Sequence, residues 1–286
     1  MIKKGIILAG GSGTRLSPLT KAVNKQLLPI NDKPMIFYPL SVMMLANIKD
    51  ILLIVNPGQI NFFKNLLGNG SRLGISINYK IQNKPKGLPD AFILGENFIN
   101  GDNVALILGD NFFYGQNLTK TLEKSSTHTK GAKIFLKDVT NPENYGVAKI
   151  KKNKILNIIE KPKTFISNKA ITGLYFFDKN VSKFSKELKP SKRGELEITD
   201  LIKKYKKLNQ LKFEIIGRGA IWSDAGKIKD LNNISNYVKS VEEVQNIKIA
   251  CLEEISLIKK WINKKNISEN IKFYGNCEYS NYLKKF

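Results

Sequence analysis

The first 26 residues contain a glycine-rich loop with two basic side chains close behind it. A short apolar segment, residues 4–9, runs directly into Gly10-Gly11-Ser12-Gly13-Thr14-Arg15. Glycine tolerates positive φ and lets backbone N–H groups approach an anion with no Cβ in the way. Arg15 carries a planar guanidinium that can bind two phosphate oxygens, and Lys25 carries a mobile ammonium. We interpret the segment as a strand followed by a phosphate-binding loop.

The loop matches neither of two common phosphate-binding motifs. It lacks the Gly-Lys-Ser/Thr ending of the P-loop, and Leu16 stands where a Gly-x-Gly-x-x-Gly dinucleotide motif needs its third glycine. Because glycine also marks ordinary turns, a strand–helix turn that binds no ligand remains the alternative.

Asp110 is a candidate ligand for a divalent cation. It closely follows the apolar run 104–108, and the ligand crevice of an open α/β sheet lies at the carboxyl ends of its strands. Mg²⁺ prefers a few carboxylates together with phosphate oxygens. Gly109-Asp110-Asn111 is also ordinary turn chemistry, so the local sequence leaves both a metal ligand and a turn residue open.

Alternating strands and helices in the first half would position these side chains. Apolar runs predict strands at 4–9, 51–55 and 104–108, and the alternation of apolar and polar residues predicts a strand with one solvated face at 75–81. Helical patterns cover 34–45, 60–67 and 87–98. We expect Pro34 in the first turn of the first helix and a kink at Pro39. This alternation predicts a mostly parallel sheet covered by helices.

The second half has fewer helices between its strands. Strands are predicted at 133–139, 147–150, 155–159 and 174–177, with a hairpin turn at 151–154. Helices are predicted at 195–208, 227–244 and 253–262. We find no internal repeat and no low-complexity linker.

The formal net charge of +23 raises the question of nucleic-acid binding. The basic residues are scattered, and the cluster 203–207 falls where a helix needs a solvated face. Lysine and arginine together number 47, and only four are arginine: Arg15, Arg72, Arg193 and Arg218. A specific DNA-binding protein more often uses arginine at base edges. We therefore expect no nucleic-acid partner, although the charge should concentrate anionic substrates.

The sequence gives no sign of a membrane segment, a disulfide or a triad. No run approaches the ~20 apolar residues of a spanning helix, and the amino terminus leads straight into a strand with no room for a signal peptide. Cys251 and Cys277 form no C-x-x-C motif. His128, the only histidine, is expected in an exposed loop, so neither a catalytic triad nor a zinc site is supported. We expect a reduced, cytoplasmic protein with no membrane partner.

Several segments together resemble a known family. Residues 8–16, 25–29 and 32–36 are similar to the signature of the sugar nucleotidyltransferases, and most of all to the glucose-1-phosphate thymidylyltransferases among them. The resemblance runs almost from end to end. It implies an α/β, Rossmann-like nucleotidyltransferase fold with a mixed, mostly parallel central sheet flanked by helices. Residues 1–240 would form this domain, and residues 241–286 a short helical C-terminal extension packed on it.

The resemblance also implies an activity. It is the Mg²⁺-assisted in-line transfer of a thymidylyl group from dTTP to glucose-1-phosphate, giving dTDP-glucose and pyrophosphate. This reaction is the first step of dTDP-rhamnose and related polysaccharide biosynthesis. A homotetramer and feedback inhibition by dTDP-rhamnose are further expectations. Use of UTP or another sugar-1-phosphate, and a catalytically silent sugar-nucleotide binding protein, remain as alternatives.

Site residues follow from the matching segments. The catalytic cations would be Arg15, Lys25, Lys161 and Arg193. The nucleotide would be bound by Leu8, Gly10, Gly11, Gly13, Thr14, Gln26, Gln82, Gly87 and Asp110. The sugar would be bound by Asn111, Tyr145, Gly146, Glu160, Ile171 and Tyr175. The metal would be held by Asp110 and Asp224.

Local sequence alone does not decide two of these assignments. Gln82 offers both a donor and an acceptor to the imide edge of thymine or uracil, but it could also be an isolated surface glutamine. Glu160 and Lys161 could be a solvated surface pair.

The chain departs from the family at the second metal segment. The family pattern Trp-x-Asp-Thr-Gly-Thr is replaced by Trp222-Ser223-Asp224-Ala225-Gly226-Lys227. Asp224 keeps the carboxylate. Ala225 lacks the hydroxyl of the first threonine, and Lys227 places a cation where the family has the second threonine. We expect a working site with altered affinity, and a C-terminal tail shorter than is typical of the family.

Overall fold

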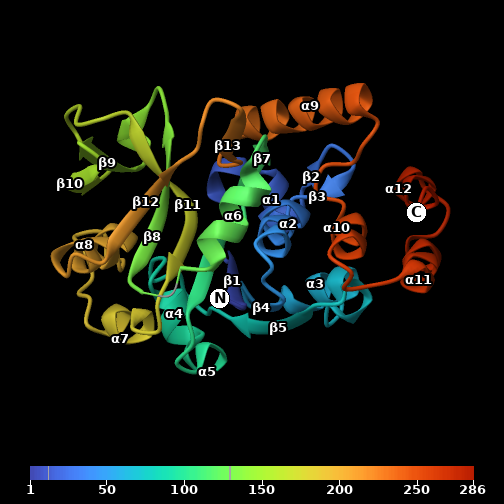
Figure 1. Cartoon of the computed structure of the whole chain (residues 1–286), viewed down its shortest axis with the longest axis horizontal. Coiled ribbons are helices and arrows are strands. Elements are labelled where there is room, and N and C mark those ends of the chain that lie inside the picture. Colours follow the sequence, from blue (N-terminus) through green and yellow to red (C-terminus); the bar gives the residue numbers. More distant parts are fainter. Residues whose placement is uncertain (12, 129) are drawn as a thin grey trace.

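Four parallel strands form the centre of the molecule. The computed structural model describes all residues except 12 and 129 (Figure 1). The central strands lie in the order β6-β1-β4-β5. Their bounds are β1 (Lys4–Ala9), β4 (Asp50–Val55), β5 (Ser76–Ile81) and β6 (Val104–Leu108). Because the strands are parallel, the loops that begin at Gly10, Asn56, Gln82 and Gly109 all lie at one edge of the sheet.

The sheet continues beyond β6 through antiparallel pairs. Strand β11 pairs antiparallel with β6, β8 and β9, and β12 pairs parallel with β8. The bounds are β8 (Ala132–Asp138), β9 (Gly146–Lys151), β10 (Lys154–Glu160), β11 (Lys169–Phe177) and β12 (Leu211–Ile215). Lys152 and Asn153, both at positive φ, form the predicted hairpin turn between β9 and β10. The predicted mixed α/β fold is confirmed.

Two small sheets lie beside the site edge. Strand β7 (Asn111–Gly115) pairs antiparallel with β13 (Ala220–Asp224), and Asn111 is opposite Asp224. Strands β2 (Pro29–Ile30) and β3 (Lys33–Pro34) form a short hairpin. Short 3-10 turns lie in the connections: η1 (Thr14–Leu16), η2 (Lys25–Leu27), η3 (Ser71–Leu73) and η4 (Pro142–Asn144).

The helices cover both faces of the sheet. Those of the first half are α1 (Leu19–Ala22), α2 (Phe37–Leu45), α3 (Ile60–Leu67), α4 (Asp90–Leu94), α5 (Glu96–Ile99) and α6 (Leu118–Ser126). Those of the second half are α7 (Val181–Lys186), α8 (Ile198–Lys207), α9 (Ile228–Gln245), α10 (Leu252–Ile258), α11 (Lys264–Tyr274) and α12 (Glu278–Leu283). Within the described residues, no helix has both the length and the apolar character needed to cross a bilayer.

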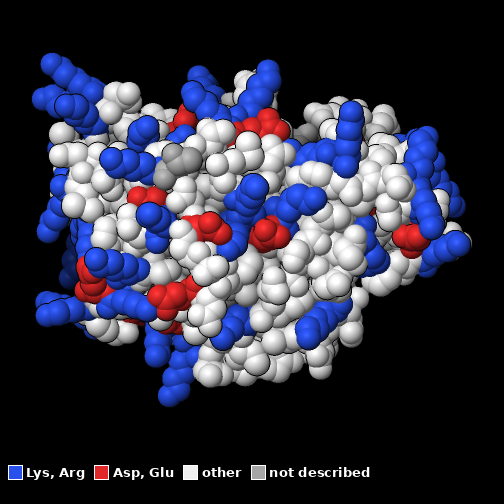
Figure 2. Space-filling model, turned by 60° about the horizontal axis from the view of Figure 1, so that its bottom comes forward, with Lys and Arg blue, Asp and Glu red and all other residues white. Residues whose placement is uncertain are grey.

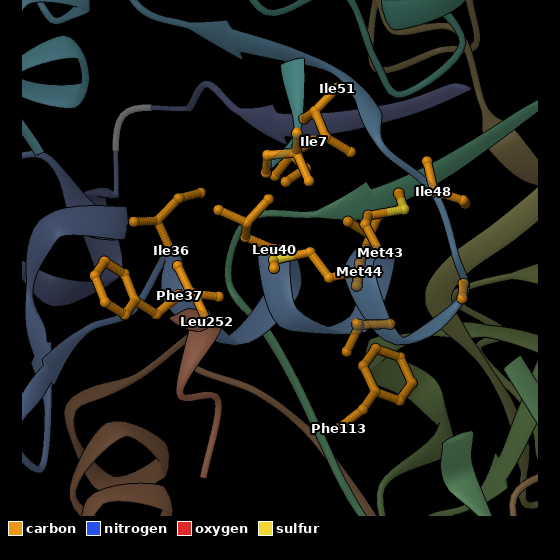
Figure 3. Packing of buried hydrophobic residues seen from close by; sticks show 14 of the residues in the cluster. Ile7, Ile36, Phe37, Leu40, Met43, Met44, Ile48, Ile51, Phe113 and Leu252 are labelled. Atoms are coloured by element: carbon orange, nitrogen blue, oxygen red, sulfur yellow. The ribbon is translucent and has the colours of Figure 1, made fainter. Parts of the chain in front are cut away.

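Helix α2 is buried on nearly all sides. Figure 3 shows Leu40 and Met43 facing Ile7 and Ile51 of the sheet, while Phe113 lies on the opposite side of the helix. On the other face of the sheet, side chains of α4, α7 and α8 pack against β1, β4 and β6. A helix that is apolar all round needs such enclosure, which explains why residues 34–45 are almost uniformly hydrophobic.

Three predicted helix boundaries are wrong. Pro34 lies in β3, and the helix α2 begins at Phe37. Pro39 is therefore in the first turn of α2 and not at a kink, because its missing N–H removes no helical hydrogen bond there. Gly95 divides the predicted helix 87–98 into α4 and α5. Helix α8 begins after residue 197, because Leu196 instead forms a β-bridge with Gly87.

A buried ion network joins the β2–β3 hairpin to α9. Lys33 is 2% exposed, and its ammonium lies 2.7 Å from Glu242, which is also buried. Lys33 and Lys248 both contact Asp32. Although burial opposes ionisation of Asp32, these two ammonium groups hold its pKa below its ordinary value. Breaking one member would leave buried charge without a partner, so the hairpin and α9 are coupled.

The C-terminal helices share the core of α2. Leu252 and Tyr279 belong to the same apolar cluster as Phe37, and the ring of Tyr279 packs edge-on against Phe37 at 6.3 Å. Helix α9 runs through residue 240, where we placed the boundary of the extension. Figure 1 shows α10 beside α2, with α11 and α12 outside it.

We expect Leu252→Ala to destabilise the whole protein in one cooperative step. Leu252 is fully buried, and truncating a buried leucine costs about 2–5 kcal/mol through lost transfer energy and a cavity. The measurement is chemical denaturation followed by circular dichroism. Ile258→Ala on the same helix is the control, because Ile258 is 71% exposed. A separate early transition confined to the tail would contradict a shared core.

Candidate active site

Asn56 holds the glycine-rich loop from the next strand. The N–H of Gly11 donates to Asn56 Oδ1 at 3.1 Å, and Asn56 Nδ2 donates back to the Gly11 carbonyl at 2.8 Å. Gly11 has φ +116°, which side-chain-bearing residues rarely adopt. The sequence analysis missed Asn56. Its position directly after a buried strand, like that of Asp110, was the available signal.

The loop places Arg15 over the second metal segment. Leu8 lies at the end of β1, and Thr14 is exposed at the start of η1, which Leu16 anchors by full burial. Gly13 is left-handed at φ +59°. Arg15 is exposed, and its Nη2 lies 3.2 Å from where a Cβ on Gly226 would be. The same Cβ position lies 3.0 Å from Asp224 Oδ2, so the guanidinium and this carboxylate flank Gly226. Within the described residues, no carboxylate oxygen lies within 4.0 Å of the Arg15 guanidinium.

Lys25 contacts Asp110 directly. Lys25 is buried in η2, and its ammonium donates to Asp110 Oδ2. Burial alone would raise the pKa of Asp110, but Lys25 and the amide of Asn111 together hold it below its ordinary value. Asp110 therefore stays ionised as a ligand should.

Asp224 lies beside Asp110 because β13 pairs with β7. The N–H of Ala225 donates to the Asp110 carbonyl at 2.9 Å, and Asp224 Oδ1 accepts from the Tyr145 hydroxyl at 2.9 Å. Burial raises the pKa of Asp224, and the charge of Asp110 raises it further. Two carboxylates close together repel each other, and a cation between them would relieve the repulsion.

Asn111 and Trp222 keep the two carboxylates in place. Asn111 is buried; its Nδ2 donates to Asp110 Oδ1 at 2.9 Å. Its Oδ1 accepts from Trp222 Nε1 at 2.7 Å and from the Gly173 N–H at 3.1 Å. Trp222 also packs edge-on against Tyr145 at 5.2 Å. The sequence analysis assigned Asn111 to sugar binding. In the structure its side-chain oxygen already accepts two hydrogen bonds from the protein.

The donor set suits a hard divalent cation. In the part of the chain that the structure describes, no cluster of three or more His, Cys, Asp or Glu could hold a metal. Asp110 and Asp224 supply two carboxylates and leave further positions for phosphate and water oxygens. This composition fits Mg²⁺-type coordination and does not fit a closed structural zinc site.

Gln82 forms one end of a buried polar pocket. It is 4% exposed, and its Nε2 donates to Asp90 Oδ2 at 2.8 Å. Because the amide nitrogen of Gln82 donates to Asp90, Gln82 Oε1 faces Gly10, where a Cβ would lie 2.9 Å away. Gln26 is also buried, next to Gly109, and its Oε1 has no hydrogen-bond partner among the described residues. The pocket therefore offers two amide acceptors to a ligand. The sequence analysis missed Asp90.

The predicted sugar residues converge at the other end of the site. Gly146, Glu160 and Ile171 meet near Thr199: a Cβ on Gly146 would lie 3.1 Å from Glu160 Oε2 and 2.8 Å from Thr199 Cγ2. Burial raises the pKa of Glu160, and Glu197 raises it further, against the opposing effects of Lys161 and Arg193. The alternative left open by the sequence, a solvated Glu160–Lys161 surface pair, does not describe Glu160, which lies within this partly buried cluster.

Arg193 lies between two carboxylates. Its Nε and Nη2 donate to Glu197 at 3.1 and 2.7 Å, and Nη2 lies 3.6 Å from Glu160. Lys161 has an exposed side chain, and its N–H donates to the Tyr145 carbonyl at 3.0 Å. A phosphate bound by Arg193 would have to share the guanidinium with Glu197, a residue that the sequence analysis did not single out.

Gly87 joins the two halves of the site. It forms a β-bridge with Leu196, and a Cβ on Gly87 would lie 2.0 Å from the Leu196 carbonyl oxygen. The Leu196 N–H donates to the Lys86 carbonyl at 2.8 Å. Any side chain at Gly87 would therefore separate the base segment from the Arg193 segment.

Two residues lie in surroundings that differ from those expected. Tyr175 is 3% exposed and stacks on Phe177 at 6.1 Å, so it lies within the core and not at an open sugar-binding surface. Burial raises its pKa, with a smaller contribution from Glu160. His128 is half-buried, which corrects the expected exposed position, and it lies far from this site at the end of α6.

The two residues that depart from the family pattern, Ala225 and Lys227, lie in different surroundings: Ala225 is buried and Lys227 is exposed. Ala225 is fully buried in the apolar cluster of Leu16 and Leu231, so a threonine there would place its hydroxyl among apolar groups unless they move. Lys227 is exposed at the N-cap of α9, which has no side-chain cap.

Comparison with known proteins identifies the family of this chain. The nucleotidyl transferase family model matches residues 4–241. A glucose-1-phosphate thymidylyltransferase of Neisseria meningitidis is 50% identical over 281 residues, covering 98% of this chain and 98% of the relative. The chain belongs to the glucose-1-phosphate thymidylyltransferase family. It is therefore a member of the nucleotidyltransferase enzymes, which generally use a divalent metal.

Other thymidylyltransferases are similar over most of the chain. The relative in Mycobacterium tuberculosis is 43% identical, with 98% of this chain and 97% of the relative covered. A Bacillus anthracis structure provisionally named as such an enzyme superposes with a TM-score of 0.78 at 38% identity, covering 88% of this chain and 98% of that one. The nearly complete mutual coverage with the Neisseria relative contradicts the expected shortening of the tail.

We expect Asn56→Ala to raise the KM for the nucleotide about tenfold. The substitution removes both hydrogen bonds to Gly11, each of which contributes about 0.5–1.5 kcal/mol. Steady-state kinetics measure the effect. Gln59→Ala, in the same loop, is the control. An unchanged KM would show that the loop keeps its shape without Asn56.

We expect Asp224→Asn to lower activity at least about a hundredfold while stabilising the metal-free protein at pH 7. The pKa of Asp224 lies above 3.8, so the folded state holds the proton more tightly than the unfolded state. The free energy of unfolding of the parent therefore falls as pH rises from about 3.8 through the raised pKa. The variant avoids this loss.

Thermal unfolding at pH 7 and near pH 3.8 without metal tests the second effect, which should shrink at the lower pH. Asp102→Asn is the control, because Asp102 is exposed and forms only a surface ion pair with Lys4. A variant less stable than the parent at pH 7 would contradict the repulsion between Asp110 and Asp224.

Proposed function

We propose that the protein transfers a thymidylyl group from dTTP to glucose-1-phosphate, forming dTDP-glucose and pyrophosphate. Membership of the thymidylyltransferase family supports the reaction, and the observation that carries it is the Asp110–Asp224 pair between a base pocket and a sugar cluster. A phosphate oxygen of glucose-1-phosphate attacks the α-phosphorus of dTTP. The bond from that phosphorus to the oxygen bridging the β-phosphate breaks, and pyrophosphate leaves.

The basic residues neutralise charge at the two ends of the reaction. Arg15 and Lys25 lie on the loop side, where the triphosphate would be held, and Lys161 and Arg193 lie by the sugar cluster. Positioning and charge neutralisation are the main contributions that phosphoryl chemistry needs from a protein. No covalent enzyme intermediate is required.

The cofactor is Mg²⁺ in this proposal. Asp110 and Asp224 would hold it, and it would supply positive charge to the phosphates of both substrates. Lys25 would compete with the cation for Asp110. When no cation is bound, the Lys25 ammonium lowers the pKa of Asp110 and so helps to keep that carboxylate ionised.

The base pocket favours thymine or uracil over cytosine. Gln82 Oε1 is an acceptor oriented by Asp90, and the imide N–H of thymine and uracil is a donor. Cytosine presents an acceptor at that position. Because uracil presents the same edge as thymine, use of UTP is the second candidate.

A catalytically silent binding protein is less well supported. Lys25, Asp110 and Asp224 are brought together with Arg15 nearby, as the reaction needs. We further propose, from family resemblance, a cytoplasmic homotetramer in the dTDP-rhamnose pathway that is inhibited by dTDP-rhamnose.

Pyrophosphate release with Mg²⁺ and glucose-1-phosphate tests the proposal. We expect faster release with dTTP than with UTP or CTP, and at least about a hundredfold slower release by Asp110→Asn, which lacks a metal ligand. Asp102→Asn, the same change at an exposed aspartate, is the control. Equal rates with UTP would broaden the nucleotide assignment. Folded protein that releases no pyrophosphate with any pair would favour the silent binder.

A further inference from the structure

A basic pocket lies at the opposite edge of the sheet from the active site. Its volume is about 310 Å³, and it is lined by Lys124, Thr127, His128, Lys130, Lys133 and Lys212. Strand β8 begins beside Phe177, which pairs with the amino end of β6, whereas Asp110 follows the carboxyl end of β6. Figure 2 turns this edge forward and shows basic side chains outnumbering acidic ones there.

Two lysines of this pocket stand side by side on neighbouring strands. Lys133 of β8 and Lys212 of β12 are register partners in a parallel pair, so their side chains leave the same face of the sheet. Like charges in adjacent positions are unfavourable. Lys124, from the end of α6, adds a third ammonium to the same pocket.

Lys133 is buried without a carboxylate partner. It is 8% exposed, and its Nζ reaches Ser125 Oγ at 3.4 Å. Across residues 1–11, 13–128 and 130–286, no carboxylate oxygen lies within 4.0 Å of this ammonium. Burial lowers the pKa of Lys133, and Lys124 and Lys212 lower it further, against the attraction of Glu214.

His128 adds an unsatisfied nitrogen. Its Nε2 is buried and has no hydrogen-bond partner among the residues that are described. Burial lowers the pKa of His128, Lys133 and Lys212 lower it further, and Asp178 opposes them.

The lysine-rich composition does not account for this arrangement. An exposed lysine is satisfied by water, but a buried ammonium needs an anion or a pKa change. Elsewhere in the chain, the buried Lys25 and Lys33 each contact a carboxylate. Among the residues that the structure describes, the pocket offers Lys133 no equivalent partner.

We propose that this pocket is a binding site for a diphosphate group, separate from the active site. Several ammonium groups and one imidazole N–H converge from α6, β8 and β12, and a diphosphate carries enough oxygens to accept from all of them. The source is either free pyrophosphate or the diphosphate of a nucleotide. The site stands on its own geometry and does not depend on the proposed activity.

The single histidine makes the site directly observable. Full-length protein with ¹³C-labelled histidine is titrated with pyrophosphate, and the His128 resonance is followed by NMR. We expect a saturable shift and a higher His128 pKa in the bound state. Lys212→Gln should weaken binding about tenfold, since it removes a charge-assisted hydrogen bond. Lys265→Gln, an exposed lysine on α11, should leave binding unchanged.

Two further arms complete the test. Lys25→Gln weakens phosphate binding in the active site but should leave the His128 shift intact. Thymidine diphosphate is compared with pyrophosphate: tighter binding of the nucleotide identifies a nucleotide site, and equal or weaker binding identifies free diphosphate. The proposal is overturned if His128 shows no saturable shift, if Lys212→Gln binds as the parent does, or if Lys25→Gln abolishes the shift.

Discussion

The closeness of Asp110 and Asp224 is the constraint on which the rest of the site depends. The two carboxylates come from segments more than a hundred residues apart and meet because β7 pairs with β13. Their mutual repulsion is partly relieved by Lys25 on one side and by the Tyr145 hydroxyl on the other. The opposite pKa directions of the pair follow from this: the carboxylate with an ammonium partner is lowered, and the other is raised.

A second level of organisation keeps these groups from moving. Asn111 and Trp222 link the carboxylates to the sheet through buried hydrogen bonds, Asn56 holds the glycine loop, and Asp90 orients Gln82. None of these contacts needs a substrate. The site is therefore largely preorganised, as catalysis by positioning and electrostatics requires.

The tail contributes to the same framework. Helix α10 covers α2, and α9 is tied through Glu242 to Lys33, a few residues after the loop that carries Lys25. Displacement of the tail would expose the apolar surface of α2 and remove the Glu242 carboxylate from Lys33. The loss of Thr at Ala225 is accommodated by the same packing, because the methyl group belongs to a cluster that joins Leu16 to α9.

The sequence by itself determined the chemistry and the order of the elements. The central strands, the glycine loop and the candidate ligands are local patterns, and parallel connectivity alone brings the loops after β1, β4, β5 and β6 to one edge. Only the tertiary structure decided which groups remain free to act. Gln82 Oε1 faces Gly10 because the amide nitrogen of Gln82 donates to Asp90, whereas Asn111 Oδ1 accepts from Trp222 and Gly173. Such pairings depend on contacts between residues distant in sequence, which periodicity and composition do not encode.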